Sequence, residues 1–173
     1  MSAFTAAEIE ALIPRLRRFA RALTGSREAA DDLTQDTLER AWVKRDLWQA
    51  GTNLRAWLFA VMHGVFVNGK RRARTTESLD GPDVPGLERA DAGASAETAI
   101  AVRDLRTALL RLPDEQRQIV LLVGLEQLSY AEAAEVLGVP IGTVMSRLAR
   151  GRERLRQLLE DGLPDQHGLR RVK

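Results

Sequence analysis

The chain of 173 residues could form one domain or two small ones, and its hydrophobic content of 45% suffices for ordinary cores. It contains no cysteine, which excludes disulfides, thiolate metal sites and a cysteine nucleophile. No apolar run approaches the roughly 18 residues of a membrane span, and the N-terminal sequence lacks the layout of a secretion signal. We therefore expect a cytoplasmic protein without a membrane span.

Charge is distributed unevenly, although the net charge is only +2. Residues 1–73 contain 12 Lys/Arg and 8 Asp/Glu, and residues 100–173 contain 12 and 10. The segment 74–99 between them contains 2 and 6. Two cationic segments thus flank an acidic one, a distribution that favours a polyanionic partner.

A linker is predicted in the middle of the chain, where Gly81-Pro82 and Pro85-Gly86 interrupt a stretch rich in Asp, Ser and Ala. No alternation typical of β-strands flanks it. We predict an all-α fold of two small helical domains joined by a flexible linker. The predicted parts are a first domain at 1–74, the linker at 75–95, a second domain at 96–162 and a C-terminal tail at 163–173.

Three helices are predicted in the first domain. Thr5 and Glu8 have the spacing of a capping box ahead of the first run of apolar residues at helical spacing. Ser26 can cap the second helix, whose apolar stripe ends at Trp42. A short loop, RDLWQAGT, precedes a third helix that starts near Asn53. We expect the apolar stripes to form the core of the domain.

The second domain contains the stretch SYAEAAEVLGVPIGTVMSRLARGRERL. Ser129 and Glu132 have capping-box spacing, so they predict the start of a short helix. Gly138 can adopt the left-handed conformation that ends it, and Pro140 suits the opening of the next helix. The pattern predicts a helix-turn-helix.

The second helix of this motif has an apolar face and a basic face. Five arginines and a single acid, Glu153, lie between Ile141 and Arg156. A solvated helical hairpin could have the same charge, but the cap, the break and the proline occur together with it. The combination favours a helix that binds DNA phosphates, with polar side chains near its N-terminus placed for base edges of a major groove.

Both domains resemble those of extracytoplasmic-function (ECF) sigma factors, the small promoter-recognition subunits of bacterial RNA polymerase. The stretch from LRLPDEQRQIVLLV to the end of the helix-turn-helix resembles the fourth sigma domain. DDLTQDTLERAW followed by NLRAWLFAVMHGVFVNGKRRAR resembles the second. The resemblance implies a protein that binds core RNA polymerase and promoter DNA, recognises the −10 and −35 elements and assists promoter melting. It also implies control by an anti-sigma factor, and neither a cofactor nor a small-molecule substrate.

The resemblance assigns roles to three sets of residues. The set matching the polymerase-binding motif is Asp32, Gln35 and Asp36. The set matching the −10 and melting region is Trp48, Gln49, Arg55, Lys70, Arg71 and Arg72. The set matching the −35 contacts is Thr143, Met145, Ser146, Arg147, Ala149, Arg150 and Arg152. Within this last set, the side chains of Met145 and Ala149 could supply only apolar contacts, such as contacts to thymine methyl groups.

The third helix departs from the family pattern at three positions. The family often has an Arg-Asn pair followed by an Asp, where this chain has His63-Gly64 and then Asn68. The roles of these positions therefore stay open. His63 has no second metal ligand nearby in the sequence, so we expect no metal site.

Two other classes of protein are alternatives to a sigma factor. An ordinary helix-turn-helix regulator with an N-terminal sensing module would bind duplex DNA without a polymerase, but it would not need the DDLTQD surface or a helix ending in GKRRAR. An enzyme is not expected, because the chain has only two histidines, His63 and His167, and no phosphate-binding glycine loop.

Overall fold

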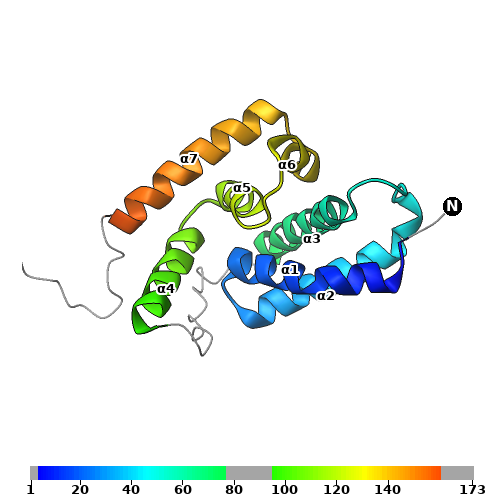
Figure 1. Cartoon of the computed structure of the whole chain (residues 1–173), viewed down its shortest axis with the longest axis horizontal. Coiled ribbons are helices and arrows are strands. Elements are labelled where there is room, and N and C mark those ends of the chain that lie inside the picture. The colour runs from blue at the N-terminus through cyan, green and yellow to red at the C-terminus, as the bar shows by residue number, and fades with distance from the viewer. Residues whose placement is uncertain (1–3, 77–94, 161–173) are drawn as a thin grey trace, which may run out of the picture.

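The computed structural model describes residues 4–76 and 95–160, and in these ranges it contains helices and no strand. The first module consists of α1 (Ala6–Thr24), α2 (Arg27–Val43), the short 3₁₀ helix η1 (Arg45–Leu47) and α3 (Leu54–Thr76). The second consists of α4 (Ala96–Leu110), α5 (Asp114–Gly124), α6 (Tyr130–Leu137) and α7 (Ile141–Glu160) (Figure 1). The predicted all-α class with two helical domains is confirmed.

Two predicted segments fall largely or wholly outside the described residues. These are the linker at 75–95, except for its ends in α3 and at the cap of α4, and the tail at 163–173. None of the described helices is both long enough and apolar enough to cross a bilayer.

Side-chain caps start the helices at the predicted places. The Glu8 N–H donates to Thr5 Oγ1 and the Thr5 N–H donates to Glu8 Oε2, at 3.3 and 2.7 Å, so the capping box is complete. Ser26 Oγ accepts from the Ala29 N–H at 3.3 Å. Asn53 Oδ1 accepts from a backbone N–H in the first turn of α3 at 3.2 Å. These bonds satisfy N–H groups that the first turn of a helix leaves without partners.

The end of α1 requires a glycine for two reasons. Gly25 has a φ of +78°, in the left-handed region that favours glycine. A Cβ atom at this position would also lie only 2.6 Å from a methyl carbon of Leu110 at the end of α4. The C-terminal ends of α1 and α4 therefore approach each other closely.

The two modules pack against each other, although the sequence predicted only a tether between them. Helix α1 contacts α4 and α5, and α3 contacts α6 (Figure 1). Buried residues of both modules form one continuous hydrophobic cluster, which includes Leu23 and Phe59 of the first and Leu112 and Ile119 of the second.

Arg117 is a buried cation that joins the two modules. Its guanidinium donates to the carbonyl oxygens of Leu109, Leu110 and Leu112 at 2.9 to 3.0 Å, and to that of Leu23 in the first module at 2.6 Å. Burial lowers the pKa of Arg117, and the Asp114 carboxylate at 3.2 Å opposes this effect. One side chain thus satisfies the carbonyl groups that the ends of α1 and α4 leave without helical partners.

Two helical glycines differ in the space around them, so replacement by alanine should change the free energy of unfolding in opposite directions. A Cβ atom at Gly64 meets nothing within 4 Å, whereas one at Gly151 would lie 2.9 Å from Val120 Cγ2. We predict that Gly64→Ala raises the free energy of unfolding by about 0.5–1 kcal/mol, because alanine is the better helix former. Gly151→Ala should lower it, since α7 must shift away from α5. Urea unfolding of both variants checks this, and equal effects would contradict it.

Loss of the Arg117 guanidinium should destabilise the protein strongly. We predict that Arg117→Met lowers the free energy of unfolding by roughly 3–5 kcal/mol, because four carbonyl groups at the helix ends lose their donor. The matched control is Arg111→Met, at the exposed position that directly follows the same helix. A loss below about 1 kcal/mol for Arg117→Met would show that the carbonyl groups find other partners.

Candidate nucleic-acid and partner interfaces

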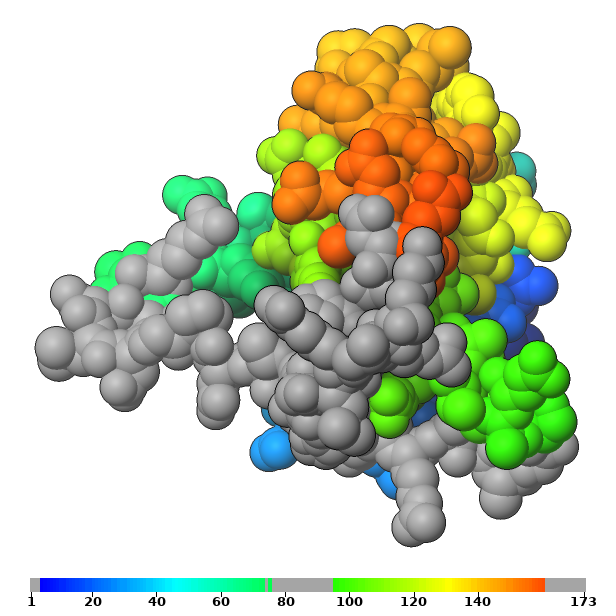
Figure 2. Space-filling view, turned by 90° about the vertical axis from the view of Figure 1, so that its left-hand side faces the viewer, coloured from blue at the N-terminus to red at the C-terminus, as the bar shows by residue number. Residues whose placement is uncertain are grey.

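Helix α7 presents one face to the protein and the other to solvent. Val144, Leu148 and Gly151 are buried against the rest of the second module. The start of α6 has the predicted capping box, and Gly138, with a φ of +62°, ends it. The predicted helix-turn-helix geometry is present, and α7 lies at an edge of the molecule, where Figure 2 shows its orange surface projecting.

Most of the residues matched to −35 contacts lie on the open face of α7. Met145 is 53% exposed. Arg150 is aligned along its own helix, because its Nε donates to the Ser146 carbonyl at 3.2 Å, and Ser146 Oγ donates in turn to the Thr143 carbonyl at 3.1 Å. The exposed members of the set are Met145, Ser146, Ala149, Arg150 and Arg152, and Thr143 is half-buried.

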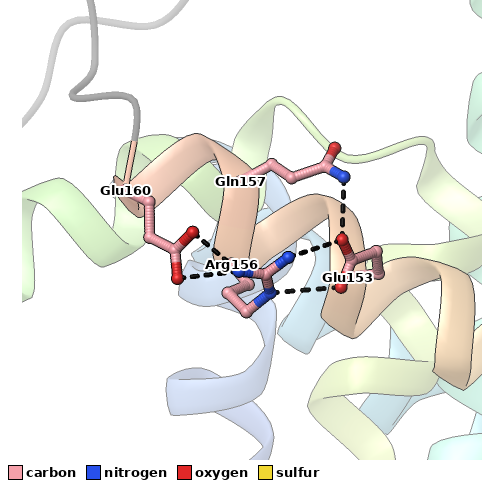
Figure 3. A network of polar contacts seen from close by, with 4 residues as sticks. All are labelled: Glu153, Arg156, Gln157 and Glu160. Carbon is pink, nitrogen blue, oxygen red and sulfur yellow. Dashed lines mark hydrogen bonds and ion pairs between the residues drawn. The ribbon is translucent and has the colours of Figure 1, made fainter.

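Two arginines of α7 are already paired. Arg147 Nη2 lies 2.8 Å from Glu115 Oε2 of α5, so this side chain, which is 25% exposed, turns back toward the protein. Arg156 contacts Glu153 and Glu160 at 2.7 Å each, on the last turns of the helix (Figure 3). These contacts raise the pKa of Arg156, and the Arg156 and Gln157 hydrogen bonds lower the pKa of Glu153. The other exposed arginines of α7 are Arg150, Arg152 and Arg154.

The residues matched to polymerase binding lie together on the solvent side of α2. Asp32, Gln35 and Asp36 are all exposed. Behind them Thr34 and Thr37 are buried, and each hydroxyl donates to the carbonyl four residues earlier, at 2.7 and 2.6 Å. The hydroxyl groups of the buried threonines are thus satisfied within the helix, and the outer face of α2 carries the exposed polar groups. On this face Gln35 Nε2 also donates to Glu39 at 3.0 Å.

An apolar groove of about 610 Å³ lies between α1 and α2, next to this polar face. Its lining includes Ile9, Leu38 and Trp42, with Glu10 and Glu39 also lining it. The sequence predicted that Trp42 belongs to the core stripe, but the residue is 47% exposed. Helical spacing indicates the face of the helix on which a residue lies. It does not show whether a neighbouring helix covers that residue.

The residues matched to the −10 region are divided among three places. Trp48 packs on Phe4, with ring centroids 5.7 Å apart, and the neighbouring Gln49 is exposed. Arg55 Nη1 donates to the Glu126 carbonyl of the second module at 3.2 Å. The remaining members follow about 22 Å further along α3, at the helix rise of 1.5 Å per residue. They are Lys70, Arg71 and Arg72.

Lys70 near the end of α3 also contacts the second module, as does His63, one of the departures from the family pattern. Lys70 Nζ lies 3.6 Å from Asp114 Oδ2. His63 Nδ1 lies 2.6 Å from Gln118 Oε1 of α5, so the histidine belongs to the contact between the modules. Asn68 is exposed in a hollow between α2 and α3. Among the described residues, no group of three or more His, Asp or Glu side chains could hold a metal ion.

Comparisons with known proteins cover both modules. The family model "Sigma2 domain of PhyR" matches residues 9–63, and "Sigma-70, region 4" matches residues 103–155. The ECF RNA polymerase sigma factor EcfG of Rhodopseudomonas palustris is 39% identical over 160 residues, which are 91% of this chain and 87% of the relative. SigM of Mycobacterium tuberculosis, also an ECF sigma factor, is 38% identical over 145 residues, or 84% and 71% of the two chains.

A solved structure is similar over nearly the same extent. It is the sigma factor RpoE in complex with the anti-sigma factor NepR from Bartonella quintana, with a TM-score of 0.77 and 36% sequence identity. The similarity covers 89% of this chain and 95% of that one. Both helical modules and their order along the chain are therefore shared with this structure.

Arg150 and Arg152, two exposed arginines of α7, should differ in whether they contact a base or a phosphate. If Arg150 contacts a base through both of its terminal nitrogens, Arg150→Ala should relax recognition at one −35 position and cost roughly 1–3 kcal/mol. Arg152→Ala, the matched control, should weaken binding equally for all sequences and reduce its salt dependence. Competition among promoter fragments in the presence of core polymerase checks both. A uniform loss for Arg150→Ala would make it a phosphate contact only.

Proposed function

Since the chain belongs to the ECF RNA polymerase sigma factors, we propose that it binds core RNA polymerase through α2 and directs it to promoters through α7 and α3. The observation that carries this function is that both sigma modules occur in one chain, with an exposed face on each. The protein itself makes and breaks no bond. It acts in the cytoplasm as a specificity subunit of the polymerase.

The −35 element is bound by the open face of α7. Its exposed Ser146 and Arg150 can donate to base edges, while Met145 and Ala149 offer apolar contact to thymine methyl groups. Arg152 and Arg154, both exposed, supply charge for the adjacent phosphates. Arg147 instead pairs with Glu115 within the same module.

The −10 element is opened by the loop after η1 together with α3. Trp48 and Gln49 lie near the start of α3, where an unstacked base can be received, and Arg55, Lys70, Arg71 and Arg72 supply cations for the displaced strand. Two of these cations contact the second module in this structure. The melting surface is therefore assembled only when the modules separate.

The chain is further proposed to be controlled by an anti-sigma factor. This rests on the similar RpoE structure, which was solved in complex with the anti-sigma factor NepR. Residues 9–63 match a domain of PhyR, and PhyR is an anti-anti-sigma factor with a solved structure in complex with the anti-sigma factor NepR. This match admits a second function, in which the chain would only imitate a sigma factor by binding an anti-sigma factor. Binding to core polymerase separates the two functions.

Transcription in vitro from a library of promoter fragments tests the proposed function. Core polymerase supplied with the purified chain should initiate at a restricted set of promoters, and core polymerase alone should not. A chain that binds an anti-sigma factor and leaves the start sites of the polymerase unchanged would support the imitation instead.

Replacement of the polar face of α2 should weaken polymerase binding without unfolding the protein. We predict that the triple change Asp32→Ala, Gln35→Ala and Asp36→Ala lowers the affinity for core polymerase at least about tenfold, because exposed groups on a docking face are lost. Alanine is a strong helix former, so circular dichroism should be unchanged. The control, Glu135→Ala, removes an exposed acid of α6. Equal competition for core by the triple variant and the control would contradict the assignment.

A further inference from the structure

The turn between α5 and α6 carries a carboxylate that is buried between the modules. The Glu126 side chain is 0% exposed. Arg18 Nη2 lies 2.9 Å from Glu126 Oε1, and Arg15 Nη1 lies 3.5 Å from Oε2. Both arginines belong to α1, in the other module, and each is about half exposed. The buried charge of one module thus depends on cations supplied by the other.

The same turn is held from its other side by α3. Arg55 Nη1 donates to the Glu126 carbonyl at 3.2 Å. Asn53 Nδ2 donates to Glu132 Oε1 at 2.6 Å, and Glu132 also completes the capping box of α6. The Ser129 backbone N–H and, to a lesser extent, the Asn53 amide lower the pKa of Glu132. The helix-turn-helix is therefore tied to the first module by polar contacts on both sides of Glu126.

The electrostatics of this contact favour a reversible closure. A carboxylate removed from water is costly unless cations or hydrogen bonds compensate it. When the modules are together, Arg15 and Arg18 compensate Glu126, and when they are apart, water can hydrate all three groups. Loss of the two arginines should therefore shift the equilibrium toward separated modules.

The closed arrangement cannot contact both promoter elements at once. Helix α3, which carries four of the six −10 candidates, packs directly on α6 of the helix-turn-helix. At 1.5 Å per residue α3 and α7 are only about 35 and 30 Å long. The −35 and −10 elements lie about 25 base pairs apart, or about 85 Å at 3.4 Å per base pair. The modules must separate before the chain can span a promoter.

We propose that Glu126, Arg15 and Arg18 form an interdomain clasp that holds the free chain closed and that polymerase binding releases. The inference that the clasp holds the two modules together is independent of the proposed function. The inference that the polymerase releases the clasp rests on the proposed function. In this device the energy of core binding opens the chain, and the apparent affinity for core is reduced by the fraction of chains that are closed.

Pulsed electron paramagnetic resonance between two spin labels tests the clasp. Because the chain has no cysteine, Ala29→Cys in α2 and Ala131→Cys in α6, both exposed, give one label in each module. The otherwise unaltered chain should give one narrow distance distribution. The double variant Arg15→Ala and Arg18→Ala should add a longer distance and raise the ratio of open to closed chains about tenfold or more.

The matched control removes two other arginines of the first module. Arg17→Ala and Arg27→Ala delete the pair that contacts Asp31 within the module, at 3.8 and 3.9 Å, and should leave the distances unchanged. Circular dichroism shows whether the helices persist in every variant. An unchanged distribution in the Arg15/Arg18 variant would overturn the clasp.

Affinity for core polymerase tests the release. The Arg15/Arg18 variant should bind core more tightly than the unaltered chain, by about the same factor as its gain in open chains. A longer distance without tighter binding would overturn the coupling to the polymerase. If neither chain bound core, the proposed function would fail, while the distance measurement would still decide whether the clasp exists.

Discussion

The arrangement of the two modules depends on the buried guanidinium of Arg117. It donates to carbonyl groups at the ends of α1 and α4 at the same time, so it fixes the point where the two modules meet. Few other side chains could do this, because a planar group with five N–H donors is needed to reach several carbonyl oxygens from one place. Close to this point, Gly25 allows α1 to end directly against Leu110.

Away from this junction, polar contacts between the modules accompany their shared hydrophobic cluster, and they determine which functional faces are open. The α7 face with Met145 and Arg150 and the α2 face with Asp32 and Asp36 are exposed to solvent. Arg55 and Lys70 are instead held against the second module. On the proposed function, a chain in this state can meet the polymerase and a −35 sequence, but two side chains proposed for strand opening contact the second module. Contacts between domains that are rich in ion pairs suit an interface that opens, because water replaces each lost partner.

The sequence was sufficient to predict the features that depend on near neighbours. Both capping boxes, Thr5 with Glu8 and Ser129 with Glu132, bond across three residues, so their spacing alone indicates them. The contact of Arg55 with Glu126 joins residues 71 apart and depends on how two helical surfaces meet, which periodicity does not encode. The exposure of Trp42 was missed for the same reason. The pairing of Arg147 with Glu115 likewise could not be predicted, since a basic stripe does not show which of its arginines find acids on a neighbouring helix.

On the proposed function, one chain carries two DNA-binding surfaces that act together only after the polymerase has separated them. Hydroxyl-radical footprinting of a single promoter fragment tests this most directly, with the chain alone, core polymerase alone and both together. We predict protection at the −35 and −10 elements on the same fragment only when both proteins are present. Strong protection of one short duplex site by the chain alone, unchanged when core polymerase is added, would contradict it.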